Sequence, residues 1–294
     1  MTINTDCFLA CRDAAETTSL IADLSNSLAV RKINLLLPAD TDDSEEVPEG
    51  CRAVAVNTVT GSDTIGAMAG LTEADYALLF TKAWTVTLGA GAVERMVRAA
   101  EDSGAAMVYP DHYTVTDGKL APHPAIDYQK GSVRDDFDFG SVLLIRADLL
   151  RKFAMQRSGG PNYTYAGLYD LRLFLSREGE IFHLNEYLYT EEQTDNRTSG
   201  EKQFDYVNPA NRNVQIEMEQ AVTAHLTAIG ALVDTDNYIE PNFNEQNFPV
   251  EASVIIPVRN RERTITDAVK SALSQETDFD YNVIVVDNHS TDNT

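Results

Sequence analysis

The sequence predicts an α/β fold in which a mostly parallel sheet is flanked by helices. Short apolar and β-branched runs alternate with amphipathic helical patterns in residues 1–205, and the same alternation returns in residues 250–294. Such alternation is typical of doubly wound sheets, and strands that are apolar throughout indicate a parallel sheet covered on both faces. Residues 206–249 are predicted to form a helical connector and linker between the two.

The first stretch of the chain predicts a strand, a helix and a second strand over residues 6–37. Its helix is expected at Thr17–Leu28, because Leu20, Ile21 and Leu24 repeat with helical spacing. Further strands and helices are predicted in turn at residues 53–57, 63–71, 76–80, 90–100, 106–109, 139–146, 147–153, 167–175, 180–184 and 187–189. Together they predict one sheet domain.

The connector contains one strong helical pattern, Asn213–Leu232. Val214, Met218 and Val222 fall on one side of this helix, and polar side chains fall on another. We expect a strut that packs on the N-terminal sheet or between the domains, and the alternative is a helix that binds a partner. The polar stretches around the helix predict linkers.

Composition excludes several classes of function. The 294 residues carry a formal net charge of −23, which argues against a nucleic-acid-binding face and against docking on anionic lipid. The cysteines Cys7, Cys11 and Cys51 lack metal-ligand spacing, so reduced thiols in the cytoplasm are expected. No apolar run reaches the length of a transmembrane segment, and no export signal is recognisable. A cytoplasmic protein is therefore predicted.

The last stretch predicts a βαβ unit. Ser253–Val258 and Tyr281–Val286 are apolar strands, and an amphipathic helix at residues 265–273 lies between them. Polar turns at residues 259–262 and 287–292 follow the two strands. Ligands of open α/β sheets bind at the carboxyl ends of the strands, so both turns are placed where a ligand would bind.

The motifs in this unit carry a family resemblance. Ser-Val-Ile-Ile-Pro-Val-Arg-Asn-Arg-Glu at residues 253–262, followed by Val-Ile-Val-Val-Asp-Asn-His-Ser-Thr-Asp-Asn-Thr at 283–294, resembles the opening of a family-2 glycosyltransferase of the GT-A fold. The resemblance implies a Rossmann-like fold of the nucleotide-diphospho-sugar transferase type. It also implies a nucleotide-sugar half-site at Pro257, Val258, Arg259, Asn260, Glu262 and Asp287. An unrelated Rossmann-like turn is the alternative.

Residues 1–205 resemble the same family more faintly. Residues 74–84 fall where the family has a strand ending in Asp-x-Asp, and residues 167–175 match a helix that normally begins with Glu-Asp. Those family positions hold the metal and the catalytic base. The family's aspartate that Asp287 matches falls on or near Pro38 in this part of the chain.

The chemistry at these positions departs from the family. Thr81-Lys82-Ala83 stands in place of Asp-x-Asp, and a lysine repels the cation that carboxylate oxygens would bind. Gly167-Leu168 stands in place of Glu-Asp, and neither side chain can accept a proton. We therefore expect a degenerate GT-A-like domain with no catalytic residue and no metal ligand.

Other acidic and aromatic residues are interpreted as structural. Asp40-Thr41-Asp42, Asp135–Asp138 and Asp234-Thr235-Asp236 contain Asp-x-Asp spellings, but such spellings are common among 46 acidic residues and indicate solvated loops. His112 and His123 are a weak signal for a metal site or an acid–base pair. Trp84 is interpreted as core packing rather than a platform for a sugar.

The resemblance implies a tandem glycosyltransferase of which residues 250–294 are the first part of a catalytic domain. The parent protein would transfer a sugar from a nucleotide-sugar donor to a glycan or lipid-linked acceptor, in the synthesis of a polysaccharide or cell-surface glycan. A divalent metal, Mn²⁺ or Mg²⁺, is expected as a Lewis acid in the full-length parent only, and none is expected in this chain. The chain alone is expected to be inactive.

The alternative is a non-catalytic scaffold module that binds a glycan or a partner. Two strands and one helix cannot bury their apolar faces unaided, since small isolated sheets are marginally stable. The C-terminal βαβ fragment is therefore expected to dock on the N-terminal domain, to self-associate through its strand edges, or to be poorly ordered.

Overall fold

The computed structural model describes residues 3–12, 17–41, 47–83, 85–192, 212–239 and 248–294. The chain divides into two compact units, Met1–Leu232 (unit 1) and Val233–Thr294 (unit 2). Trp84, Asp42 and the polar stretch before residue 212 lie outside the described residues. None of the helices in the described part of the chain is long and apolar enough to span a membrane.

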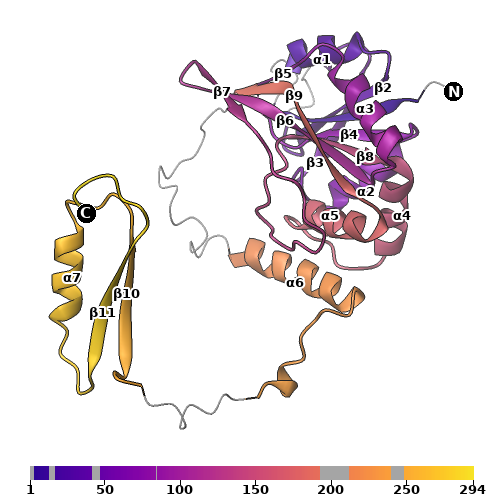
Figure 1. Cartoon of the computed structure of the whole chain (residues 1–294). Coiled ribbons are helices and arrows are strands. Elements are labelled where there is room, and N and C mark those ends of the chain that lie inside the picture. The colour runs from indigo at the N-terminus through magenta and orange to yellow at the C-terminus, as the bar shows by residue number, and fades with distance from the viewer. Residues whose placement is uncertain (1–2, 13–16, 42–46, 84, 193–211, 240–247) are drawn as a thin grey trace. The chain divides into compact units, whose positions relative to one another are not determined.

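Unit 1 is built on one nine-stranded sheet (Figure 1). Its strands are β1 (Thr5–Ala10), β2 (Val30–Pro38), β3 (Cys51–Val56), β4 (Tyr76–Phe80), β5 (Thr85–Leu88), β6 (Met107–Thr116), β7 (Lys119–His123), β8 (Val142–Arg146) and β9 (Ile181–Glu192). Their order is β3-β2-β1-β4-β8-β6-β9-β5, with β7 paired to β6. β5, β7 and β8 run opposite to the other six, so the sheet is mostly parallel, as predicted.

Two layers of helices cover this sheet. The helices of unit 1 are α1 (Thr18–Ser25), α2 (Ser62–Leu71), α3 (Ala92–Ser103), α4 (Ala147–Arg157), α5 (Gly167–Glu178) and α6 (Arg212–Ala228). Side chains of α1 and α3 share one hydrophobic cluster, and those of α2, α4 and α5 share a second cluster on the other face. The predicted α/β fold class is confirmed.

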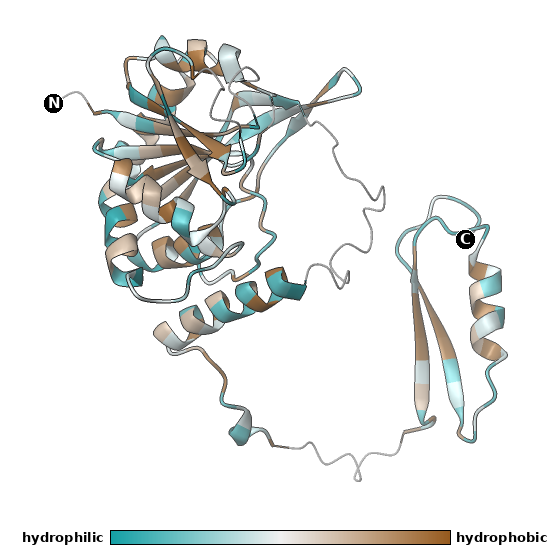
Figure 2. Cartoon of the chain, turned by 180° about the vertical axis from the view of Figure 1, so that it is seen from behind, coloured by the Kyte–Doolittle hydropathy of each residue, from teal (hydrophilic) through white to brown (hydrophobic). Residues whose placement is uncertain are grey.

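Strand alternation explains why the central strands are apolar throughout. Successive side chains of a strand point to opposite faces of the sheet. Leu9 of β1 and Leu78 of β4 pack with α1 and α3, whereas Phe8 and Leu79 pack with α2, α4 and α5, and all four are fully buried. Figure 2 shows this apolar interior as brown strands between two helical layers.

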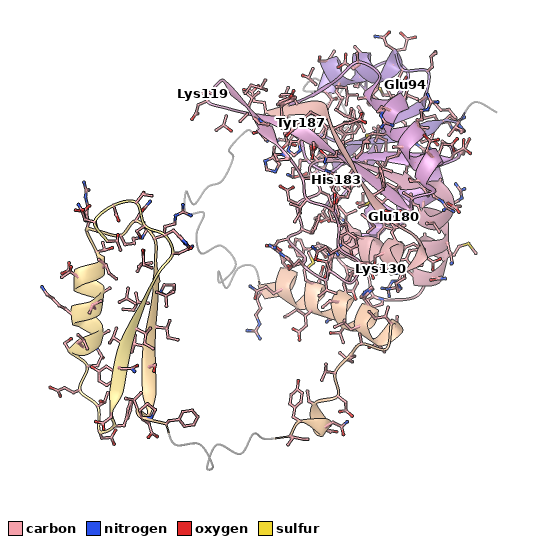
Figure 3. The ribbon with its side chains drawn as sticks, viewed as in Figure 1. Glu94, Lys119, Lys130, Glu180, His183 and Tyr187 are labelled. Atoms are coloured by element: carbon pink, nitrogen blue, oxygen red, sulfur yellow. The ribbon has the colours of Figure 1, made fainter. Side chains whose placement is uncertain are left out.

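The second half of the sheet differs from the predicted pattern. The two strands predicted at residues 180–184 and 187–189 form one long strand, β9, whose pairing with β6 is irregular after Pro110. The short strands β5 and β7 were not predicted. β7 forms a hairpin with β6 through Asp117 and Gly118, which both have positive φ. Its residues are almost all exposed and show no regular alternation of apolar and polar side chains, so the sequence gives no strand signal. Figure 3 shows this hairpin with Lys119 near its tip.

The helix predicted in the connector, α6, packs on α5 in unit 1. Ala221 is fully buried, and Met218 and Val222 contact the same small cluster as Leu173 of α5. Glu217 accepts hydrogen bonds from the backbone N–H groups of Thr164 (3.1 Å), Tyr165 (2.7 Å) and Ala166 (3.2 Å), just before α5 begins. The compact unit therefore extends through α6.

Unit 2 is the predicted βαβ arrangement. β10 (Ala252–Val258) and β11 (Tyr281–Asp287) are parallel, α7 (Ile265–Leu273) connects them, and a short 3₁₀ helix (Thr235–Asn237) precedes them. Within this unit Ile255, Leu273 and Val286 are exposed. Within unit 2, α7 alone therefore does not cover the apolar side chains of both strands.

Candidate functional site

The carboxyl ends of β10 and β11 form one polar edge of unit 2. The strands stay paired up to Val258 and Asp287, and Asn288 N–H donates to the Val258 carbonyl at 2.8 Å. The two polar turns therefore leave the sheet side by side. This is the position at which parallel α/β sheets bind ligands.

Asn260 links the two turns. Its backbone N–H donates to Ser290 Oγ (2.9 Å), and its Oδ1 accepts from Thr291 N–H (2.8 Å). Asn260 and His289 have φ of 53°, a left-handed conformation that asparagine and histidine tolerate better than most residues. The sequence thus holds the two turns together through one amide side chain.

The carboxylates of Asp287 and Glu262 belong to the same network. Asp287 accepts hydrogen bonds from the N–H (3.3 Å) and the hydroxyl of Ser290. Glu262 accepts from Asn293 Nδ2 at 3.1 Å, and its backbone N–H donates to Asp292 Oδ2 at 3.1 Å. Four of the six predicted residues, Val258, Asn260, Glu262 and Asp287, are therefore brought together at this edge.

The other two predicted residues are placed less tightly. Pro257 pairs with Val286 inside the strand ladder. Arg259 is exposed and forms no hydrogen bond or ion pair with any residue that the structure describes. Asp292 and Thr294, which the prediction omitted, bind the first turn through Glu262 N–H and Arg261 N–H. Asp292 belongs to the Ser290-Thr291-Asp292 motif, which the sequence analysis recognised without assigning a role to Asp292.

The corresponding edge of unit 1 has different chemistry. Thr81-Lys82-Ala83 follows β4, and Thr81 N–H donates to the Ser141 carbonyl at 2.8 Å. A hydroxyl, an ammonium and a methyl group do not fit a hard divalent cation, which prefers carboxylate oxygens. Among the described residues no group of three His, Cys, Asp or Glu side chains could hold a metal ion.

The start of α5 is closed to a side chain. A Cβ atom added at Gly167 would lie 2.6 Å from the carbonyl carbon of Gly61 and 2.8 Å from Ser62 Cα, closer still to the Ser62 nitrogen. Real Cβ atoms do not approach backbone this closely, so this position has no room for a larger side chain in this fold.

A buried polar cluster lies beside this edge. Glu191 accepts a hydrogen bond from Ser141 Oγ (2.5 Å) and lies 3.3 Å from His112 Nε2, and Ser141 N–H donates to the hydroxyl of Tyr189 (2.8 Å). Burial acts to raise the pKa of Glu191, but hydrogen bonds from His112 and Ser141, with the charges of His112 and Lys82, outweigh it and lower that pKa. The carboxylate is thus held ionised inside the protein.

Three histidines of unit 1 are engaged with carboxylates and rings. His112 stacks on His123 (4.5 Å between centroids), and His123 lies 2.8 Å from Asp138. His183, labelled in Figure 3, bridges Asp111 and Asp127 at 2.8 and 2.7 Å. The spacing of these residues in the sequence gave no signal for these pairs, because β6, β7 and β9 bring them together across the sheet.

A cavity of about 540 Å³ opens at the same edge of unit 1. Its interior is lined by Leu143, Ile145 and Phe139, and Lys82, Arg172 and the aspartates of residues 135–138 also line it. This volume falls in the range of small-molecule sites, which combine an apolar lining with a few polar groups. The interpretation of residues 135–138 as a simple solvated loop is therefore incomplete.

A sequence comparison relates the C-terminal unit to a known family. Unit 2 is a parallel βαβ unit with a polar turn after each strand, as in nucleotide-binding α/β folds. Residues 253–294 match the family model described as Glycosyl transferase family 2. This match confirms the resemblance for those residues. No curated protein sequence matches the chain.

Several solved structures are similar to the chain. The crystal structure of S. aureus TarS 1–349 has a TM-score of 0.46 and 10% identity, covering 64% of this chain and 60% of that one. The same protein in complex with UDP-GlcNAc gives 0.49 and 9%, covering 76% and 72%. Mannosyl-3-phosphoglycerate synthase from Rubrobacter xylanophilus gives 0.42 and 11%, covering 81% and 78%. At such low scores and identities nothing about the chain's activity follows from them.

Proposed function

We propose that the chain is part of a glycosyltransferase and that the polar edge of unit 2 holds part of a nucleotide-sugar donor. The parent protein would transfer the sugar to a glycan or lipid-linked acceptor in the synthesis of a polysaccharide or cell-surface glycan. The observation that carries this proposal is the meeting of Asn260, Glu262 and Asp287 at the carboxyl edge of a unit that matches the glycosyltransferase family.

Each group has a role in this proposal. The carboxylate of Asp287 accepts hydrogen bonds from a donor hydroxyl or base N–H, and the network through Asn260 and Ser290 keeps the two turns at a fixed separation. Unit 1 is non-catalytic, since Lys82 and Gly167 occupy the positions that would hold the metal and the base. No detectable sugar transfer or donor hydrolysis is expected from the chain alone.

The nucleotide site is tested by titrating the full chain with uridine and guanosine diphosphate while ¹⁵N-labelled amides are observed by NMR. We expect shifts at residues 258–262 and 287–292, and at least about tenfold weaker binding in Asp287→Asn, because a hydrogen bond to a charged group contributes about 1.5–3 kcal/mol. Asp280→Asn, an exposed change at the other end of β11, is the matched control and should bind as the unchanged chain does.

Two results would contradict this proposal. Chemical-shift changes confined to residues of unit 1 around Lys82 would mean that the nucleotide binds to unit 1 and not to the polar edge of unit 2. Sugar transfer by the purified chain would mean that the catalytic groups are present and that the family register assigned to unit 1 is wrong.

A second function is favoured by the cavity of unit 1. In this reading unit 1 is a non-catalytic module that binds a glycan, another ligand or a partner, and unit 2 is attached to it. A cavity with an apolar interior and several charged groups, at an edge where metal and base positions are filled by Lys82 and Gly167, supports binding without catalysis.

A further inference from the structure

Arg172 is a buried cation without a carboxylate partner. Its side chain lines the cavity of unit 1, and the residue is only 4% exposed. It donates to the carbonyl oxygens of Ser132 (2.8 Å) and Arg134 and lies 3.4 Å from the Tyr128 hydroxyl. Among the described residues no carboxylate forms an ion pair with it. Burying a charge is costly unless an opposite charge compensates it.

The guanidinium of Arg172 also has hydrogen-bond donors that no described residue accepts. Of its five N–H groups, two on Nη1 and one on Nη2 have partners. The second Nη2 hydrogen and the Nε hydrogen have none among the residues that the structure describes. The rings of Tyr169 (4.8 Å), Tyr128 (5.7 Å) and Phe139 (5.9 Å) hold the group in place. Arg172 is therefore fixed, charged and incompletely paired.

The carboxylates around the cavity do not compensate this charge. Asp136 is exposed and forms an ion pair with Arg134, and Asp138 lies 2.8 Å from His123. Asp135 is exposed to solvent. Water weakens the field of these exposed carboxylates, whereas the charge of Arg172 is buried, where electrostatic interactions are stronger.

The apolar lining adds a second requirement for a ligand. Leu143 and Ile145 are buried core residues that also line the cavity, beside Phe137 and Phe139. Contact with such surface favours a guest with an apolar body, at about 25 cal/mol per Å² of apolar area buried. The polar end of the guest would lie toward Arg172.

We propose that the cavity of unit 1 binds an organic anion, a carboxylate or a phosphate monoester carried on an apolar body. The anionic oxygens accept hydrogen bonds from the two remaining N–H groups of Arg172, and the apolar body of the ligand packs against Phe139 and Leu143. The inference rests on the second function above in that unit 1 binds a ligand, and it names the chemical class of that ligand.

The test is calorimetric titration of the full chain with four probes of equal chain length: hexanoate, hexyl phosphate, hexanol and hexylamine. We expect at least one anion to bind about tenfold or more tightly than both hexanol and hexylamine, and the stronger anion identifies carboxylate or phosphate as the preferred group. Arg172→Met should lose this preference. Arg134→Met, an exposed arginine beside the same cavity, is the matched control and should keep it.

Because Arg172 also holds two carbonyl groups, its replacement could unfold unit 1, which circular dichroism would reveal. Thr60→Phe then provides an independent variant, since Thr60 lines the cavity and a larger side chain there should block all four probes. Equal affinity for hexanol and the anions would overturn the inference while leaving a binding module intact. Absence of binding by every probe would also overturn the inference, without deciding whether unit 1 binds a glycan or a partner. Neither result bears on the nucleotide site of unit 2.

Discussion

Two residues, Gly167 and Lys82, limit what the carboxyl edge of unit 1 can do, each through one physical property. Gly167 acts through space, because the backbone of Gly61 and Ser62 occupies the volume that a larger residue would need. Lys82 acts through charge, because an ammonium stands where a metal site would need carboxylates. Neither effect depends on the other, so each can be tested separately.

The space around Gly167 can be tested with the smallest possible side chain. Gly167→Ala should destabilise unit 1 by about 1–3 kcal/mol in urea unfolding, since overpacking forces the backbone to shift. Gly66→Ala is the matched control within α2, where an added Cβ meets nothing within 4 Å. That change should be neutral or stabilising by up to about 1 kcal/mol, as alanine is favoured over glycine in helices. Equal effects of the two substitutions would contradict the close contact.

Glu191 gives unit 1 a dependence on acid. Its pKa in the folded state lies below the ordinary value, so the unfolded chain takes up the proton first as pH falls. The stabilisation is complete above the unfolded pKa, about 4.3, and is lost as pH falls through the lower folded pKa. Glu191→Gln should therefore lower stability at pH 7 and flatten its decline below about pH 4.5. Urea unfolding across this range measures both.

The matched control for that experiment is Glu192→Gln. Glu192 is the next residue of β9 and is exposed. This variant should keep the stability and the acid dependence of the unchanged chain. A similar loss in both variants would assign the effect to the overall negative charge rather than to the contacts of Glu191 with Ser141 and His112.

At the scale of elements, α6 is attached to α5 at both ends of their contact. Near the start of α6, Glu217 accepts hydrogen bonds from three backbone N–H groups that precede α5. Farther along α6, His225 Nδ1 lies 2.7 Å from Arg177 Nη1. Between them Ala221 is buried against α5. A carboxylate at such unpaired N–H groups satisfies donors and complements the helix dipole.

The attachment through Glu217 is testable by removing its charge. Glu217→Gln should weaken the docking of α6 by about 1–2 kcal/mol, comparable to the loss of a helix cap. Hydrogen exchange of residues 212–228 should rise accordingly. Glu219→Gln, an exposed change two residues along the same helix, is the control and should leave exchange unchanged. Faster exchange in both variants would mean that Glu217 has no special role.

For the whole molecule, periodicity predicted the alternating strands and helices because burial on both faces demands it. For the strands β1 to β4, most of the observed ends lie within one or two residues of the predicted ones. The strands β5 and β7 were not predicted. β5 is short and pairs with β9, which is far away in the sequence, and β7 is short and shows no regular alternation of apolar and polar residues. The antiparallel insertion of β8 between β4 and β6 likewise leaves no local signal.

The candidate sites divide in the same way. The edge of unit 2 was predictable since Asn260 and Asp287 stand in motifs that follow two strands. The cavity of unit 1 was not, because Arg172 reads as one polar residue of an amphipathic helix. Only the three-dimensional structure reveals that no carboxylate among the described residues pairs with it. The tandem arrangement, the metal of the parent and self-association through unit 2 remain predictions.

The contact between Gly167 and the Gly61–Ser62 backbone also bears on descent. Any codon change that replaces Gly167 meets the start of α2 before it can supply a proton acceptor. A lineage with this packing would have to reposition α2 first, through changes that bring no catalytic benefit by themselves. The close approach therefore opposes any single substitution that would place a carboxylate at this position.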